Sequence, residues 1–245
     1  YEPFVCGGAL LLELAPTNAT INDSNRELIY VYKCLRNKKL FKKMYDLCKE
    51  HEAKHSEEYY YHVRDLDRKK TKFSKMTMPE KAARCLYLNK ACFNGLFRVS
   101  GKGFFNVPSG KKDKVKCFDE ENIQALHRYF NTKKPTILNK DFADAVANAK
   151  AGDFVYFDPP YDVVGEQSFT SYTSGGFGKG EQIRLRDLIK ELTERGVLVM
   201  ASNAHTPFID EIYKDFNVHV INAKRMINSK GDGRGAVEEV IVTNY

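Results

Sequence analysis

Residues 154–161 read Phe154-Val155-Tyr156-Phe157-Asp158-Pro159-Pro160-Tyr161, an apolar run followed by an acid, two prolines and a tyrosine. The apolar run predicts a short buried strand, and the proline pair predicts that the chain then enters a loop. Open α/β sheets bind their ligands at the carboxyl ends of their strands. A carboxylate, two rigid residues and an aromatic ring at such an edge indicate a pocket for a flat, polar, hydrogen-bonding group. A loop with a capping aspartate and a helix-stopping proline pair is the alternative interpretation.

The chain on either side of this segment alternates strand and helix patterns. Short apolar runs predict strands at 1–6, 19–22, 136–138, 154–157, 197–201, 217–221 and 239–243. Helical patterns are predicted at 9–14, 24–35, 141–149, 180–195 and 207–214. Ser24 with Glu27 fits a capping box at the start of the second of these helices. This alternation favours an α/β fold with a doubly wound, mostly parallel sheet.

Residues 38–134 follow a different pattern. Helices are predicted near 38–51, 57–68, 79–92 and 119–130. A glycine-rich centre between β-prone flanks predicts a β-hairpin over 98–107, and a basic loop follows it. We therefore expect one α/β domain made of 1–37 and 135–245, with 38–134 inserted as a mainly helical lobe that carries the hairpin.

The net charge of +7 is unevenly distributed along the chain. Residues 38–134 hold 24 basic and 12 acidic side chains, a net +12, while the remainder holds 15 basic and 20 acidic side chains, a net −5. A basic lobe is the electrostatic signature expected of a protein that binds a phosphate backbone. Solvated helices rich in lysine and arginine would give the same balance, so charge alone leaves both interpretations open.

Several classes of protein are not expected. The 245-residue chain has no apolar run near the roughly 20 residues of a membrane span, and no signal peptide is evident. Six scattered cysteines without a CxxC pair argue against a disulfide scaffold or a zinc site and favour reduced thiols in the cytosol. The chain begins at Tyr1 within a predicted strand, so we expect its natural start to lie upstream.

Asp158-Pro159-Pro160-Tyr161 resembles the DPPY motif of amino-methyltransferases, which methylate the exocyclic amine of a nucleobase. An adenine N6 amine is a poor nucleophile because its lone pair is delocalised into the ring. The carboxylate of Asp158 and the backbone carbonyl of Pro159 can accept hydrogen bonds from both N–H groups and so localise that lone pair. Proline stiffness, including that of Pro160, holds these acceptors in place, and Tyr161 offers a face for an extruded base. This chemistry requires no metal and no covalent intermediate.

The methyl donor would be a sulfonium such as S-adenosylmethionine, bound beside the first strand. The expected contacts follow the first three strands and the motif: Phe4, Cys6, Gly7 and Gly8, then Asp23, then Asp141 and Phe142, and finally Asp158. The glycine pair would form a close-approach turn, Asp23 would bind ribose hydroxyls, and Phe142 with its neighbouring acid would receive the adenine ring. A plain strand–helix turn is the alternative for the glycines, and a helix N-cap is the alternative for Asp23.

Several ordered motifs make the resemblance more specific. They are Tyr1–Phe4, Ile21–Asp23, Phe93–Arg98, Phe105–Pro108, Asp158–Tyr161, Phe169–Tyr172 and Ser202–Asn203. Together they resemble the Dam-type (D12 class) DNA adenine-N6 methyltransferases, close in pattern to enzymes of bacterial GATC restriction–modification systems. The resemblance implies a Rossmann-like, S-adenosylmethionine-dependent catalytic domain at 1–37 and 135–245, with 38–134 as the target-recognition lobe for duplex DNA. It also implies a cytoplasmic, bacterial or phage-encoded monomer that releases S-adenosylhomocysteine and has a cognate restriction endonuclease as a candidate partner.

The resemblance further implies roles within the lobe. The segment containing Phe93, Asn94 and Leu96 would intrude at the target base, and the hairpin would enter the major groove with Arg98 bidentate to a guanine. Further DNA contacts are implied for Asn106, Pro108, Lys111 and Lys112, the lysines binding backbone phosphates. Core packing is the alternative for Phe93 and Leu96, and a phosphate contact is the alternative for Arg98.

Two departures from the family pattern bear on the cofactor. The family's glycine- and lysine-containing motif before the first strand is absent, because this chain begins too late. Cys6 replaces the usual glycine of the first turn, and its Cβ is expected to crowd the cofactor or to require negative φ.

Two alternative functions stay open. One is methylation of another substrate, cytosine N4 or RNA adenine, and the other is a catalytically inactive DNA-binding module. DPPY rather than SPPY or NPPY favours adenine, and the presence of Asp158, Tyr161 and Asp23 favours an active enzyme.

Overall fold

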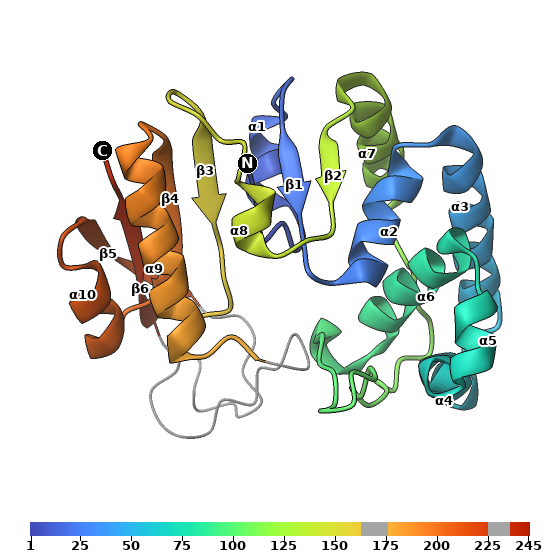
Figure 1. Ribbon diagram of the computed structural model, residues 1–245. Helices are drawn as coiled ribbons and strands as arrows, with labels where there is room; N and C mark the ends of the chain where they lie inside the picture. The colour runs from blue at the N-terminus through green and yellow to red at the C-terminus, as the bar shows by residue number, and fades with distance from the viewer. Residues whose placement is uncertain (163–175, 225–235) are drawn as a thin grey trace.

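The computed structural model spans residues 1–245 and describes 1–162, 176–224 and 236–245 (Figure 1). The strands are β1 (Thr20–Asn22), β2 (Thr136–Leu138), β3 (Phe154–Phe157), β4 (Leu198–Ala204), β5 (Asn217–Lys224) and β6 (Ala236–Thr243). The helices associated with them are α1 (Ala9–Leu14), α2 (Arg26–Leu35), α8 (Phe142–Ala145), α9 (Lys179–Glu194) and α10 (Pro207–Tyr213). The predicted motif Phe169–Tyr172 lies outside the described residues.

The strands form two small sheets. β1 and β2 pair in parallel, with Ile21 opposite Ile137. In the second sheet the order is β3-β4-β6-β5, with β3 parallel to β4 and β6 antiparallel to both of its neighbours. The chain is therefore a mixed α/β protein, and the predicted strand Phe154–Phe157 has the predicted bounds.

The first two residues lie between the sheets. Glu2 forms a parallel bridge with Ile21 of β1, and its carbonyl accepts from the Asn22 N–H at 3.0 Å. On the other side the Tyr1 ammonium donates to the Phe154 carbonyl at 2.7 Å. The prediction of a strand over residues 1–6 is wrong beyond this pair, because the chain turns directly after it.

The remaining helices of the described residues gather on one side of the molecule, next to α2 (Figure 1). They are α3 (Lys38–Ala53), α4 (Glu57–Arg64), η1 (Asp65–Arg68), α5 (Lys70–Lys75), α6 (Met78–Ala91), η2 (Phe93–Gly95) and α7 (Glu120–Lys133). One hydrophobic core joins α2, α3 and α6 and reaches Ile21 of β1. A second core lies between β3, β4, α9 and α10. The domain boundaries at 37/38 and 134/135 stay a prediction.

Polar caps explain where the helices begin. The side chain of Asn25 accepts hydrogen bonds from the N–H groups of Glu27 and Leu28, at 3.1 and 3.3 Å, and thus caps α2. The predicted capping box between Ser24 and Glu27 is therefore wrong by one residue. Asn37 caps α3 in the same way, which separates α3 from the end of α2.

The predicted hairpin over 98–107 is reduced to a bridged turn. Val99 and Phe105 form an isolated antiparallel bridge, and the Asn106 N–H donates to the Arg98 carbonyl at 3.1 Å. A longer ladder does not form here because Pro108 has no N–H to donate. Its carbonyl instead accepts from the Phe93 N–H at 3.0 Å. The turn is thereby tied to η2.

Candidate active site

The motif Asp158–Tyr161 lies at the carboxyl end of β3. Figure 1 shows the arrows of β1, β2 and β3 pointing to the same edge of the molecule. The parallel register pairs Phe157 with Ala201, so Asp158 comes next to Ser202 of β4. The Ser202 hydroxyl donates to Oδ1 of Asp158 at 2.6 Å. The catalytic candidate is thus half-buried, with one carboxylate oxygen oriented by a hydroxyl.

A buried amide pair fixes the rest of the motif loop. Nε2 of Gln182, on α9, donates to the Pro160 carbonyl at 2.9 Å. Nδ2 of Asn203 donates to Oε1 of Gln182 at 3.0 Å, and Oδ1 of Asn203 accepts from the Asp162 N–H at 2.9 Å. Gln182 is 0% exposed. These bonds hold the loop through the Pro160 carbonyl. The carbonyl of Pro159, which is the proposed acceptor for the amine, is not used by them.

Sequence reasoning gave Gln182 no role. It lies 22 residues after Pro160, on a helix that was predicted only from its periodicity. The neighbouring pair Ser202-Asn203 was part of the resemblance but also had no assigned function. Their roles depend on the approach of β4 and α9 to the motif, and local sequence patterns do not report such contacts.

Tyr161 is half-buried beside the second sheet. Burial raises the pKa of its hydroxyl above the usual value, although a hydrogen bond with Ser202 lowers it. The hydroxyl also lies 3.5 Å from Oε2 of Glu239 on β6. The hydroxyl is therefore uncharged at physiological pH. The ring is held at the edge of the loop, where it can serve as a stacking surface.

The first turn is strained and closely held. Cys6 has φ 43° and Gly8 has φ 69°, both in the left-handed region. Of the two expected consequences of a cysteine here, the negative φ is therefore wrong, and crowding of the cofactor stays a prediction. The Cys6 N–H donates to Oδ2 of Asp23 at 3.1 Å, and the Cys6 carbonyl accepts from the Tyr32 hydroxyl at 2.8 Å. These two bonds offset the strain of a non-glycine residue there, which costs roughly 1–3 kcal/mol.

Asp23 connects this turn to the start of α2. Its Oδ1 accepts from the Asn25 N–H at 2.8 Å while its Oδ2 accepts from the Cys6 N–H. Burial raises the pKa of this carboxyl, and the two backbone N–H groups act in the opposite direction. A Cβ added to Gly7 would meet no atom within 4 Å, so space is open over the turn. The turn therefore has room for a ligand beside a carboxylate.

Phe142 lies in a packed aromatic cluster, and the exposed Asp141 beside it is bound by Arg184. The Phe142 ring is buried, stacks on Phe4 with centroids 5.3 Å apart, and carries the Arg184 guanidinium 4.5 Å from its centroid. Arg184 of α9 also donates to Oδ2 of Asp141 at 3.0 Å. Burial works to raise the pKa of Asp141, but Arg184 and the Ala143 N–H hold it below the usual value. The structure thus brings Phe4 and Phe142 together, and their rings pack against each other.

Phe93 of η2 and Leu96, directly after η2, face solvent. Phe93 is 42% exposed and Leu96 is 40% exposed, so the core-packing alternative for them is wrong. Between them Asn94 has φ 52° and Gly95 has φ 65°, and this tight turn projects the flanking side chains. Two apolar side chains held on an exposed turn are a structural feature suited to contact with another molecule.

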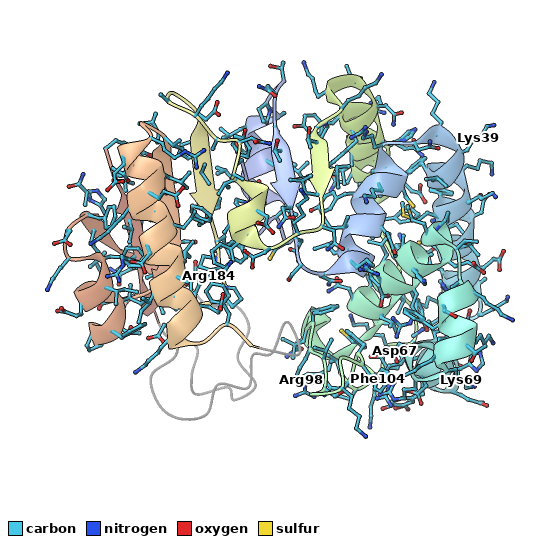
Figure 2. The ribbon with its side chains drawn as sticks, in the orientation of Figure 1. Lys39, Asp67, Lys69, Arg98, Phe104 and Arg184 are labelled. Carbon is cyan, nitrogen blue, oxygen red and sulfur yellow. The ribbon has the colours of Figure 1, made fainter. Side chains whose placement is uncertain are left out.

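The other residues predicted to bind DNA surround this turn. The exposed Arg98 donates from Nε to Oδ1 of Asn106 at 2.8 Å. Lys111 and Lys112 are exposed, and Nζ of Lys112 donates to the Lys90 carbonyl at the end of α6, at 2.5 Å. Figure 2 shows Arg98 at the lower end of the helices that gather next to α2. It shows Arg184 on α9, in the other half of the molecule.

Within residues 1–162, 176–224 and 236–245, no group of three or more His, Cys, Asp or Glu side chains is arranged to hold a metal ion. In the same part of the chain, no helix is both long and apolar enough to cross a membrane.

Comparison with known proteins gives the class. The D12 class N6 adenine-specific DNA methyltransferases match this chain over residues 1–227, and the chain belongs to that family. It is 46% identical over 246 residues to the Type II methyltransferase M1.LlaDCHI of Lactococcus lactis subsp. cremoris, covering 100% of this chain and 86% of that protein. It is 38% identical over 256 residues to the Type II methyltransferase M.MjaIII of Methanocaldococcus jannaschii, covering 100% and 87%. A DNA adenine methylase of Vibrio cholerae is 31% identical over 249 residues, covering 98% and 84%.

These matches confirm the predicted family and reaction class. The chain is a DNA methyltransferase of the adenine-N6 class, and DNA is its substrate. Enzymes of this kind generally take their methyl group from S-adenosylmethionine.

Proposed function

We propose that this enzyme transfers a methyl group directly from S-adenosylmethionine to N6 of an adenine flipped out of duplex DNA, within the sequence GATC. The observation that carries the proposal is the Asp158 carboxylate at the carboxyl end of β3, oriented by the Ser202 hydroxyl at 2.6 Å. Because Ser202 donates to Oδ1, Oδ2 is the oxygen that would accept from the target amine. The Pro159 carbonyl would accept from the second N–H.

The motif residues would act on the amine without moving. Two acceptors localise its lone pair, and the Gln182 bond to Pro160 keeps the loop that carries them rigid. The neutral Tyr161 ring would stack on the extruded base. Preorganisation is the main contribution that such a site makes, since the acceptors need no reorientation when the base arrives.

The donor would bind at the first turn. The open space over Gly7 and the carboxylate of Asp23 beside it fit a ribose-bearing ligand, with Cys6, Gly8 and Phe4 close by. Asp141 and Phe142 would lie at its adenine end. The bound sulfonium supplies an electrophilic methyl group and leaves as S-adenosylhomocysteine. Asp158 would face both the donor and the target base.

The lobe over 38–134 would read the duplex. The exposure of Phe93 and Leu96 supports their intrusion at the target site, with Asn94 between them. Arg98 would bind a guanine in the major groove with support from Asn106. Pro108, Lys111 and Lys112 would complete the interface, the lysines through phosphates.

The hydrogen bonds of Tyr1 and Glu2 to both sheets support one doubly wound, mostly parallel sheet into which the recognition lobe is inserted. We further propose a cytoplasmic, bacterial or phage-encoded enzyme that acts as a monomer and needs no metal. A cognate restriction endonuclease is proposed because two relatives are named Type II methyltransferases.

The test is methyl transfer from labelled S-adenosylmethionine to two unmethylated duplexes. One contains GATC, and the matched duplex has the central A·T pair inverted. Label recovered as N6-methyladenine from the GATC duplex alone is the expected result. Equal label in both duplexes would contradict the proposed specificity, and label on cytosine would contradict the proposed base.

A further inference from the structure

The turn over 98–107 holds Phe105 against Val99 by a single antiparallel bridge. The hydrogen bonds of that bridge belong to neighbouring residues, as where the Asn106 N–H donates to the Arg98 carbonyl at 3.1 Å. The N–H and C=O groups of Phe105 therefore point away from Val99, toward the helical lobe.

Two consecutive side chains of η1 bind these outward-facing groups. The Phe105 N–H donates to Oδ2 of Asp67 at 2.8 Å. The Phe105 carbonyl accepts from Nη2 of Arg68 at 3.2 Å. Asp67 thus accepts from Phe105 and Arg68 donates to it. An adjacent strand would make the same pair of hydrogen bonds with this residue. We call Asp67 and Arg68 the η1 clamp.

A buried arginine sets the position of Asp67. Arg84 of α6 is 1% exposed, and its Nη2 lies 2.9 Å from Oδ2 of Asp67. The same guanidinium donates to both carboxylate oxygens of Glu27 and to the carbonyls of Val63 and Arg64. A planar guanidinium with this many partners has a single geometry, so the carboxylate that meets Phe105 is fixed in place.

A pocket lies beside the turn. Its volume is about 210 Å³, and its lining includes Asp67, Arg84, Phe97 and Phe104. The η1 clamp therefore holds the turn from one side of this pocket.

The η1 clamp reaches Arg98 through the next residue of the chain. Asn106 follows Phe105, its Oδ1 accepts from Nε of Arg98 at 2.8 Å, and its carbonyl accepts from Nη2 at 3.4 Å. Figure 2 shows Asp67, Phe104 and Arg98 at the same end of the helical part. The orientation of the Arg98 guanidinium thus depends on a backbone that η1 holds.

We propose that Asp67 and Arg68 are positioning residues that set Arg98 for base recognition, a role that rests on the proposed contact of Arg98 with guanine. They touch neither DNA nor donor in this account. Their effect is on discrimination between sequences, since a guanidinium fork must be aligned to bind a base edge with two hydrogen bonds.

The test measures kcat/KM on the sequence that the enzyme methylates and on duplexes with each G·C pair of that sequence changed in turn. Arg98→Ala is expected to lower the largest discrimination ratio about 5- to 150-fold. Arg68→Ala and Asp67→Ala are each expected to lower the same ratio by about 3- to 10-fold, the effect of one hydrogen bond. Lys69→Ala, which removes a neighbouring exposed charge, is the matched control and leaves the ratio unchanged.

Combined variants separate positioning from general damage. Adding Arg68→Ala to Arg98→Ala is expected to cause no further loss of discrimination, because the clamp acts through Arg98. Multiplied losses would overturn the inference. Hydrogen exchange of the Phe105 amide should also accelerate in Asp67→Ala and stay unchanged in Asp67→Asn, because the amide oxygen of asparagine still accepts from the N–H. Arg68→Ala, at an exposed residue, keeps the test valid if Asp67→Ala does not fold.

The failure of the inference and that of the proposed function are distinguishable. If Arg98→Ala leaves every ratio unchanged, Arg98 does not read a base, and its proposed guanine contact and the positioning role are both overturned, while the proposed methyl transfer is judged by the labelled-duplex experiment. If Arg98→Ala lowers a ratio while Arg68→Ala and Asp67→Ala behave like Lys69→Ala, only the positioning role is overturned.

Discussion

The Ser202 hydroxyl lies 2.6 Å from Oδ1 of Asp158 and donates a hydrogen bond to it across the β3–β4 pair. Removing that donor frees the carboxylate to rotate without deleting it. We expect Ser202→Ala to lower the single-turnover rate about 10- to 100-fold, since hydrogen bonds to charged groups contribute about 1.5–3 kcal/mol. Binding of DNA should not change. Ser24→Ala, at an exposed serine, is the control, and equal rates in the two variants would contradict this role for Ser202.

Gln182 connects the motif loop to β4, and its loss should affect both stability and rate. Gln182→Ala leaves the Pro160 carbonyl and the Asn203 amide without a buried partner. The expected cost is about 1–3 kcal/mol of unfolding free energy, with a lower kcat. Urea denaturation measures the first and single-turnover kinetics the second. Gln124→Ala, at an exposed helix position, should be neutral; an unchanged Gln182→Ala enzyme would show that the loop is rigid without the amide pair.

The strained backbone of Cys6 gives a stabilising substitution. Glycine adopts φ 43° without the penalty that a Cβ brings, although it loses more chain entropy on folding. We expect Cys6→Gly to stabilise the protein by up to about 1 kcal/mol and to leave the affinity for S-adenosylmethionine equal or higher. Thermal unfolding and calorimetric titration measure these quantities. A clear loss of stability would mean that the cysteine side chain stabilises the turn by more than its strain.

Glu2 makes the stability of the fold depend on pH. It is 7% exposed, and burial raises its pKa from 4.5 to about 7, although the Leu11 N–H bonded to it acts in the opposite direction. The folded state therefore binds the proton more tightly than the unfolded state. Stability from this group is present below about pH 4.5 and is lost as pH rises to 7, by an amount on the order of 3 kcal/mol.

Glu2→Gln removes that dependence and keeps an acceptor for the Leu11 N–H. The variant should be more stable than the wild type at pH 8, and the difference should shrink toward pH 5. Urea denaturation across this range measures it, with exposed Glu13→Gln as the control. A constant difference at every pH would contradict the assignment to Glu2.

Local patterns predicted the elements that local chemistry determines. The apolar run gave β3 with its bounds, and helical periodicity gave α2, α7 and α9 to within a few residues. The motif after β3 indicated the reaction class because its residue types fit one chemistry. The same reasoning put the cap of α2 at Ser24, because spacing alone cannot choose between two adjacent polar residues.

Contacts between distant segments were beyond the sequence. The Gln182 bond to Pro160 depends on how α9 packs against β3, and the η1 clamp depends on how η1 meets Phe105. The bridged turn replaced the predicted hairpin because Pro108 has no N–H to extend the ladder. The outward backbone groups of Phe105 find side-chain partners in Asp67 and Arg68, contacts that the hairpin pattern did not predict.

The most direct test of the account is the single-turnover methylation rate of Asp158→Ala and Asp158→Asn, with duplex binding measured in parallel. We predict that Asp158→Ala abolishes methyl transfer while DNA affinity stays within about 3-fold of wild type, because the carboxylate acts on the amine and not on the duplex. Asp158→Asn should retain a small residual rate, since its amide oxygen still accepts one hydrogen bond. Near-normal turnover in Asp158→Ala would contradict the central claim.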